Sequence, residues 1–308
     1  MAISIQRYMK EHKTIHLIGI GGVSMSALAD LLMNHGVTVT GSDRQESPTT
    51  ERLEKNGAYI TYAHLPENVD GASLVIRTAA VHDDNLEVIR ARERGIPVIE
   101  RAEAWGSLMA DYREAVCFAG THGKTTSTSM MTMITMQAGL DPTVMVGSNL
   151  PAIDGTLRIG AHDCFVAEAC EYCNSFLSFR PTIAVILNVE EDHLDFFRDI
   201  DDIISSFRRF CALVPETGLI VANADDPNTV RSVRNAQHVT TFGMSERADV
   251  RAVDVSARNG FYRFTVLVRE QFYADIRLAV PGQHNMMNAL ACCAAAEFMG
   301  IPGEAVAE

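Results

Sequence analysis

The chain has 308 residues, of which 47% are hydrophobic and 21% are charged, and its formal net charge is −13. This length and composition are typical of a globular protein with two domains and exclude a largely disordered chain. The acidic balance argues against a nucleic-acid partner, because a phosphate backbone binds to a basic surface.

The beginning of the chain lacks the apolar segment of a secretory signal, and no apolar run approaches membrane-spanning length. The seven cysteines are an odd number, and the CxxC pair formed by Cys170 and Cys173 has no second pair with which to hold zinc. We therefore expect reduced bystander thiols in a cytoplasmic protein without membrane insertion.

The first part of the chain alternates apolar strands with helical segments. Strands are predicted at 14–20, 37–43, 58–62, 73–80 and 96–100, and helices at 24–36, 47–57, 85–95 and 101–110. Such alternation with short connections indicates a parallel sheet covered on both faces. We predict a Rossmann-like α/β domain over residues 1–112.

The second part, residues 113–308, begins a new α/β pattern and then changes character. Strands are predicted at 115–120, 164–169, 182–189 and 218–223, and helices at 124–138 and 202–214. Residues 248–280 alternate with period two around a turn at Arg258–Gly260, which predicts a small antiparallel hairpin or meander. A last helix is expected after Gly282.

A glycine-containing loop, Gly120–Thr126 (GTHGKTT), joins the first strand and helix of this second domain. Glycines let several backbone N–H groups face one anion, and the following helix adds its partial positive charge. Lys124 is placed to reach terminal phosphates, and the Thr125 hydroxyl to hold Mg²⁺. The common P-loop has four residues between its glycines and this loop has two, so a glycine turn with a surface lysine is the alternative.

Two other strands end in residues suited to a metal site. His193 lies in the segment 188–195 (NVEEDHLD), and Glu168 ends the strand at 164–169. Ligands gather at the carboxyl ends of parallel strands, and Mg²⁺ takes one or two carboxylates beside phosphate oxygens and water. We predict that Glu168 and His193 share this role; a structural histidine is the alternative. Glu171 is a competing ligand, but we expect it to be a solvated turn acid.

Two weaker patterns lie near the ends of the chain. The segment Gly19–Ala29 approximates the fingerprint GxGxxG with Ser24 in place of the third glycine, and Asp43 stands near the spacing of a ribose-binding acid. This suggests a nucleotide pyrophosphate over the first helix, without specifying NAD. Asn285 and Asn288 share one helix face and could pair with a base edge or cap the helix.

In this order, the motifs GIGGxxMSxLA, GTHGKTT, a strand-end EA, NVxxDHLD and GxHNxxNALA resemble the Mur ligase family of peptidoglycan synthesis. The resemblance runs from about residue 12 to the end. It implies a UDP-sugar-binding domain followed by a central ATP-binding domain, with the family's C-terminal ligase domain absent from this chain. The implied reaction uses ATP and Mg²⁺ to join L-alanine to the lactyl carboxylate of UDP-N-acetylmuramate; we expect this chain to bind substrates without ligating them.

The resemblance also implies residue roles. Catalytic roles fall to Lys124, Glu168 and His193, and metal binding to Thr125, Glu168 and His193. ATP contacts are implied for Gly120, Thr121, His122, Gly123, Lys124, Thr125, Thr126, His284, Asn285 and Asn288. UDP-sugar contacts are implied for Gly21, Gly22, Ser24, Ser42, Asp43, Thr78, Ala79 and Ala80, and more weakly for Arg101 and Asn149. Alanine-adding relatives often carry an acidic pair where Cys170–Cys173 stands here, which leaves the role of that loop open.

Other functions remain compatible with these motifs. One is the related ligase that attaches a recycled tripeptide to the same UDP-sugar, and another is a non-catalytic nucleotide-sugar-binding module. A folate polyglutamylating ligase shares the ATP domain, but the glycine-rich N-terminal domain disfavours it.

Overall fold

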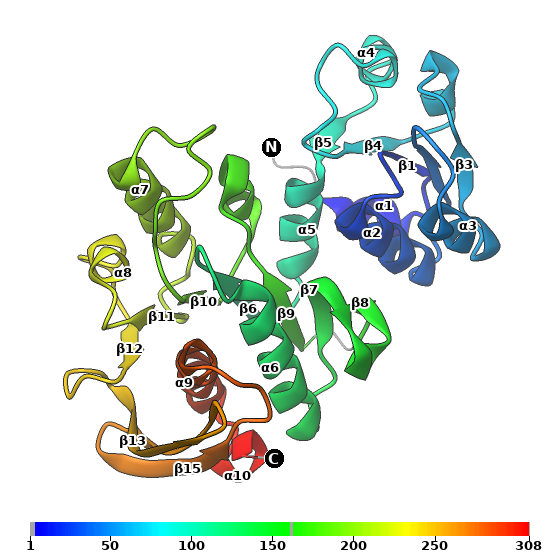
Figure 1. The fold of residues 1–308 in the computed structure, drawn as a ribbon. Coiled ribbons are helices and arrows are strands. Elements are labelled where there is room, and N and C mark those ends of the chain that lie inside the picture. The colour runs from blue at the N-terminus through cyan, green and yellow to red at the C-terminus, as the bar shows by residue number, and fades with distance from the viewer. Residues whose placement is uncertain (1–3, 161–162, 308) are drawn as a thin grey trace. The chain divides into compact units, whose positions relative to one another are not determined.

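The computed structural model describes residues 4–160 and 163–307, and the chain divides into two compact units, Met1–Asp111 and Tyr112–Glu308 (Figure 1). Each unit is an α/β structure with a sheet of its own, so the predicted fold class is confirmed. The second unit begins at Tyr112, one residue before the predicted boundary. Tyr112 belongs there because its hydroxyl donates to Thr143 Oγ1 (3.0 Å) and its ring packs edge-on against Phe165.

The first unit contains a five-stranded parallel sheet with the order β3-β2-β1-β4-β5. Its strands are β1 (Ile15–Ile18), β2 (Val39–Ser42), β3 (Tyr59–Thr61), β4 (Leu74–Arg77) and β5 (Val98–Glu100). All four residues of β1 are buried, as expected for the central strand of a parallel sheet. Strand order reverses beside β1, and such a switch point is where open α/β sheets bind ligands.

The helices of the first unit begin at recognisable sequence signals. They are α1 (Ile5–Lys10), α2 (Val23–Asn34), α3 (Pro48–Lys55), α4 (Leu86–Glu93) and α5 (Arg101–Met109), with a 3₁₀ turn, η1 (Pro66–Val69). Ser47 forms a capping box ahead of α3, and the Asn85 side chain accepts hydrogen bonds from the first turn of α4. The helix α2 follows the glycine turn at the end of β1, with Gly22 as its N-cap.

The second unit contains a ten-stranded mixed sheet with the order β15-β14-β13-β12-β11-β10-β6-β9-β7-β8. Its strands are β6 (Glu114–Ala119), β7 (Thr143–Leu150), β8 (Gly155–Arg158), β9 (Cys164–Glu168), β10 (Ile183–Ile186), β11 (Leu219–Asn223), β12 (Val239–Gly243), β13 (Val250–Arg258), β14 (Phe261–Val268) and β15 (Gln271–Arg277). The strands β10, β6 and β9 are parallel neighbours at its centre. Their carboxyl ends therefore meet at one edge.

Helices cover this sheet and complete its core. They are α6 (Lys124–Gln137), α7 (Ile200–Cys211), α8 (Pro227–Ser232), α9 (Gln283–Phe298) and α10 (Gly303–Ala307), with 3₁₀ turns η2 (Pro151–Ile153) and η3 (Tyr172–Ser178). The helix α7 is amphipathic, with Asp199 as its N-cap and buried Phe207 and Phe210 on its inner face. Helices α6 and α9 lie side by side, as Figure 1 shows, and both contribute to one apolar core.

The structure departs from the predicted elements in two ways. The antiparallel strands β13, β14 and β15 do not form a separate small sheet, because β12 pairs with β13 and extends the central sheet. The strands β7, β8 and β12 and the helices α1, α8 and α10 were not predicted. In β7 the apolar run is interrupted at Gly147 and its second half is exposed, so its periodicity is weak. Within the described residues, no helix is long and apolar enough to cross a membrane.

Candidate functional site

The predicted phosphate loop lies between β6 and α6, where a backbone of unusual conformation joins them. Gly120 and Gly123 have φ values of 149° and 85°, a region that favours glycine. The loop is tied to the segment after β10: Thr121 N donates to Asn188 O (3.1 Å), and His122 N donates to Asn188 Oδ1 (2.7 Å). Asn188, which follows β10, thereby holds the loop in position.

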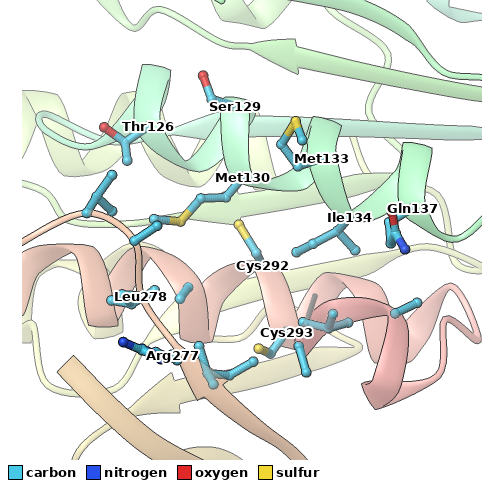
Figure 2. Close-up of a pocket in the computed structure, with 17 residues that line it drawn as sticks. Thr126, Ser129, Met130, Met133, Ile134, Gln137, Arg277, Leu278, Cys292 and Cys293 are labelled. Atoms are coloured by element: carbon cyan, nitrogen blue, oxygen red, sulfur yellow. The ribbon is translucent and has the colours of Figure 1, made fainter. Parts of the chain in front are cut away.

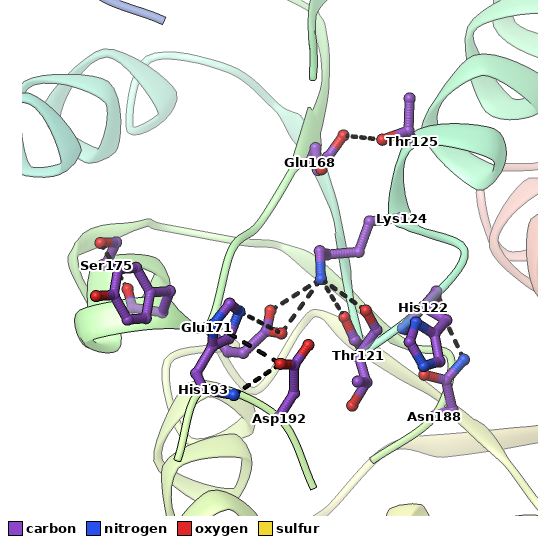
Figure 3. A network of polar contacts seen from close by, with 12 residues as sticks. Thr121, His122, Lys124, Thr125, Glu168, Glu171, Ser175, Asn188, Asp192 and His193 are labelled. Carbon is purple, nitrogen blue, oxygen red and sulfur yellow. Dashed lines mark hydrogen bonds and ion pairs between the residues drawn. The ribbon is translucent and has the colours of Figure 1, made fainter. Parts of the chain in front are cut away.

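Lys124, the first residue of α6, is at the centre of a polar network (Figure 3). Its Nζ donates to the carbonyl oxygens of Gly120 and Thr121 and forms an ion pair with Glu171, at 3.1 Å from Oε2. The Lys124 side chain is 13% exposed and that of Glu171 is 3% exposed. Lys124 is therefore not a free surface lysine; the glycine-turn alternative loses its main premise.

Glu171 corrects one expectation, because it is buried and not a solvated turn acid. It follows β9 in a turn that leads into η3, and its carboxylate faces both Lys124 and His193 Nε2, which lies 3.9 Å from Oε1. Two cationic or potentially cationic partners compensate for the removal of this carboxylate from water.

Two groups of oxygen and nitrogen donors flank Lys124. In one, Thr125 Oγ1 donates to Glu168 Oε2 (2.8 Å), which also accepts from Gly147 N (3.0 Å). In the other, Glu171, Asp192 and His193 offer ligand atoms that all lie within 4.8 Å of one another. The structure thus pairs Glu168 with Thr125, and it groups His193 with Glu171 and Asp192.

These donor sets fit a divalent cation of the Mg²⁺ type. Carboxylates supply the hard oxygen ligands that Mg²⁺ prefers, and the Thr125 hydroxyl is a further oxygen donor. The second set combines two carboxylates with an imidazole, so it also suits Mn²⁺. Either set would place the cation beside Lys124 and the phosphate loop.

The ring of Tyr172 supports His193 from one side. The two ring centroids are 4.6 Å apart, and the Tyr172 hydroxyl donates to Asp195 Oδ2 (2.9 Å). That hydrogen bond to a carboxylate raises the pKa of Tyr172 to about 12, so its hydroxyl stays protonated at neutral pH. His193 itself has φ = 52°, so its backbone adopts the left-handed conformation.

The beginning of α9 reaches the phosphate loop from a distant part of the sequence. A Cβ atom on Gly123 would lie 2.6 Å from Asn288 Oδ1, which shows how closely the two approach. Asn288 is buried and donates to Asn285 Oδ1 (3.2 Å), and Asn285 in turn donates to the Pro281 carbonyl (2.7 Å). His284 lies beside them and is exposed. Of the three predicted ATP contacts on α9, Asn288 therefore approaches the loop directly and Asn285 is hydrogen-bonded to Asn288.

Thr126 faces another feature, a cavity of about 370 Å³ between α6 and α9 (Figure 2). Met130, Ile134 and Leu278 give it a mainly apolar wall, and Thr126 lies at one end. Among the loop residues with a predicted role, Thr126 is the one that lines this cavity.

In the first unit, the glycine turn after β1 packs against the end of β2. Gly21 N donates to Asp43 Oδ2 (2.8 Å), so the predicted ribose-binding acid already engages the turn. Ser42 is fully buried and its hydroxyl donates to Glu87, whereas Ser24 Oγ accepts from Trp105 Nε1 (3.1 Å).

The remaining predicted UDP-sugar contacts lie around the same turn or after other strands. Thr78 follows β4 and approaches Gly19, where a Cβ atom would meet Thr78 Cγ2 at 2.8 Å. Gly22, Ala79 and Ala80 are exposed near these strand ends. Arg101 begins α5, and Asn149 lies exposed on β7 in the second unit.

Residue patterns missed several members of the second unit's site. Asn188 and Asp192 belong to the segment NVEEDHLD but carry no individual prediction, and Gly147 lies in a stretch without a predicted element. Their contacts could be predicted only in part from the sequence, because a position at a strand end indicates which edge of the sheet a residue occupies but not which atom it contacts.

Two family models match this chain. The Mur ligase family catalytic domain matches residues 14–113, and the Mur ligase middle domain matches residues 118–296. Two relatives named UDP-N-acetylmuramate–L-alanine ligase, from Caldanaerobacter subterraneus subsp. tengcongensis and Acetivibrio thermocellus, are each 48% identical to it over 97% and 94% of this chain. The chain spans 66% and 62% of their lengths, which is slightly less than two thirds.

Solved structures show the same likeness. The UDP-N-acetylmuramate-alanine ligase MurC of Thermotoga maritima superposes with a TM-score of 0.80 at 31% identity, covering 96% of this chain and 67% of that one. The UDP-N-acetylmuramate:L-alanyl-γ-D-glutamyl-meso-diaminopimelate ligase of Neisseria meningitides gives a TM-score of 0.86 at 27% identity, covering 96% of both chains. With family models matching both units and the phosphate loop in its strand–loop–helix setting, this chain belongs to the Mur ligase family.

Proposed function

We propose that this protein takes part in the ATP-dependent joining of L-alanine to the lactyl carboxylate of UDP-N-acetylmuramate, a step of peptidoglycan precursor synthesis. The observation that carries the proposal is the meeting of three neighbouring strand ends. Lys124 follows β6, Glu168 ends β9, and His193 follows β10. A phosphate-binding lysine and two donor sets for a divalent cation thus stand at one sheet edge, where phosphoryl transfer requires them.

The chemistry explains why a ligase needs this arrangement. A carboxylate is a poor acyl donor because oxide would have to leave, so its oxygen first attacks the γ-phosphorus of ATP and ADP departs. The amino group of L-alanine then attacks the acyl carbon, the phosphate leaves, and the nitrogen loses a proton. Two anions must approach each other in the first step, so positive charge at the site lowers its barrier.

The chain's residues divide this work among them. Backbone N–H groups around Gly120–Thr126 and the N-terminus of α6 bind phosphate oxygens, and Lys124 neutralises their charge. Thr125 and Glu168, with Glu171, Asp192 and His193, are the proposed ligands of Mg²⁺. When bound, Mg²⁺ screens the phosphate charge and orients the triphosphate.

Other residues are proposed to bind the rest of each substrate. The start of α9, with His284, Asn285 and Asn288, is the proposed contact for the adenine and ribose. The glycine turn after β1 and the residues at the ends of β2 and β4 are proposed to bind UDP-N-acetylmuramate. The free state of all seven cysteines fits a reducing cytoplasm, where we place this reaction.

A second candidate is the ligase that attaches a peptide to the same UDP-sugar. The structural likeness to the Neisseria enzyme, with its TM-score of 0.86, favours it. The 48% identity to two alanine ligases, against 27% to that peptide ligase, supports the alanine reaction. Turnover of full-length protein with L-alanine, compared with turnover with the tripeptide, separates the two.

Calorimetry on this chain tests the proposal. The wild type is expected to bind both ATP–Mg²⁺ and UDP-N-acetylmuramate. Lys124→Ala should weaken ATP binding by about 10-fold or more, because an ion pair to phosphate contributes at least about 1.4 kcal/mol, and should leave UDP-sugar binding unchanged. Lys55→Ala, at an exposed lysine of α3, is the matched control. A wild type that fails to bind either one of these ligands would refute the proposal.

A further inference from the structure

A buried carboxylate in the first unit organises the end of strand β2. Glu87 lies in the first turn of α4, and its side chain is 0% exposed. Its Oε2 accepts from Ser42 Oγ (2.8 Å) and lies 2.7 Å from His64 Nδ1. Its Oε1 accepts from Asn68 Nδ2 (2.8 Å) and lies 3.2 Å from His16 Nε2. One carboxylate thus connects four segments, namely β1, β2, η1 and the loop before η1.

The charge of Glu87 fixes the hydrogen-bonding role of the groups around it. Burial acts to raise the pKa of Glu87, but hydrogen bonds from His16, Asn68 and Ser42 outweigh it and hold the pKa below its ordinary value. Glu87 is therefore a carboxylate at neutral pH and can only accept hydrogen bonds. His64 must then carry a proton on Nδ1.

This orientation leaves the other nitrogen of His64 available. Among the contacts of the described residues, none involves His64 Nε2, and the side chain is 25% exposed, whereas that of His16 is 1% exposed. The ring also lies 3.1 Å from Ser42 Oγ, at the last residue of β2. The Ser42 carbonyl accepts from Gly19 N and Ile20 N, so Ser42 connects the His64 ring to the glycine turn.

We propose that His64 contacts the diphosphate of the nucleotide-sugar through Nε2, and that Glu87 is the positioning residue that orients its ring. The inference rests on the proposed binding of UDP-N-acetylmuramate by this unit. An imidazole that carries a proton on Nε2 donates a charge-assisted hydrogen bond to phosphate, while Glu87 accepts from Nδ1 and fixes the ring. Among the described contacts, Glu87 is the titratable group against His64, and His16 shares that carboxylate.

The test is calorimetry of this chain with UDP-N-acetylmuramate in two buffers of different ionisation enthalpy, at slightly alkaline pH. The wild type should take up protons on binding. His64→Gln should weaken binding about 10-fold, as loss of one charge-assisted hydrogen bond does, and abolish the uptake. Glu87→Gln should reduce both the affinity and the proton uptake. The double variant should bind no more weakly than His64→Gln, because Glu87 acts through His64. Glu67→Gln, an exposed acid of η1, should change neither.

Distinct results overturn distinct claims. If His64→Gln keeps the wild-type affinity and proton uptake, His64 does not contact the phosphate. If the losses of affinity in the double variant are additive, Glu87 does not act by positioning His64. If Glu87→Gln does not fold, nitrogen NMR of the wild-type imidazoles decides: an His64 Nε2 resonance that UDP-N-acetylmuramate leaves unmoved overturns the inference. A wild type that fails to bind refutes the proposed function itself, whereas binding with unaffected variants refutes only this inference.

Discussion

In the phosphate loop, Gly123 is constrained in two ways, by its backbone conformation and by a close neighbouring side chain. Gly123 has φ = 85° and also faces Asn288, so a side chain there would meet two separate obstacles. Gly139, just after α6, has a similar φ of 74° with open space around its Cβ position. Comparing substitutions at the two glycines therefore separates the free-energy cost of a strained backbone from that of a steric clash with Asn288.

We expect Gly123→Ala to destabilise the protein by about 2–3 kcal/mol and Gly139→Ala by about 1 kcal/mol, because only the first adds a clash to the strained backbone. Urea unfolding measures both values. Gly123→Ala should also abolish ATP binding, whereas Gly139→Ala should bind ATP like the wild type. Equal costs for the two substitutions would show that the approach of Asn288 is easily relieved.

At Glu171, the charge of one buried side chain links Lys124 to the donor set of Asp192 and His193. We expect Glu171→Gln to weaken Mn²⁺ binding by about 10-fold or more in the presence of ATP, because an amide is a poorer ligand than a carboxylate. Electron paramagnetic resonance measures free Mn²⁺ directly. Glu191→Gln, an exposed acid of the same segment as Asp192, is the control. Undiminished Mn²⁺ affinity in Glu171→Gln would exclude Glu171 as a ligand.

Among the elements, helix α6 is unusual in burying hydroxyl groups on its inner face. Thr132 Oγ1 donates to the Thr128 carbonyl (2.7 Å), which satisfies it within the helix. By contrast, Ser127 Oγ and Thr128 Oγ1 are buried and have no hydrogen-bond partner among the described residues. A buried polar atom without a partner costs about 1–3 kcal/mol, so α6 carries a local penalty directly after the phosphate loop.

Replacing the Thr128 hydroxyl with a methyl group tests this penalty. We expect Thr128→Val to raise the free energy of unfolding by about 1 kcal/mol, since the substitution keeps the shape and removes an unpaired oxygen. Thr132→Val loses the existing hydrogen bond to the Thr128 carbonyl and should be neutral or destabilising by up to about 1 kcal/mol. Chemical denaturation compares the two variants. A destabilised Thr128→Val would mean that its hydroxyl has a bound water as partner.

For the whole molecule, burial separates the cysteines into two classes. Cys170 and Cys173 are exposed, and the other five are buried in the second unit. Burial raises the pKa of Cys164, Cys211 and Cys293 to about 12, so almost none of these thiols is ionised at neutral pH. The thiolate is the reactive form.

Iodoacetamide at neutral pH should therefore label two of the seven cysteines in the native protein and all seven in denaturant. Mass spectrometry of peptides identifies the labelled positions. Rapid native labelling of Cys117 or Cys292 would show that the core of the second unit opens readily.

Much of the fold was predictable because its signals are local. The alternation of apolar strands and helices indicated the parallel sheet of the first unit and the α/β pattern of the second, since each element is a short continuous segment of sequence. The loop Gly120–Thr126 was recognisable for the same reason: its glycines, lysine and hydroxyls are consecutive. Strand-end positions also indicated that Glu168 and His193 belong to the edge where Lys124 lies.

What the sequence determined by itself was thus the order of elements, the phosphate loop and the edge of the sheet that carries the chemistry. The tertiary structure decided which side chains meet: Lys124 with Glu171, 47 residues away, and His16 with Glu87, 71 residues away. It also decided that β13 joins the central sheet. These pairings depend on strand order and on the packing of helices against the sheets, which act between distant segments, so no pattern within one segment encodes them.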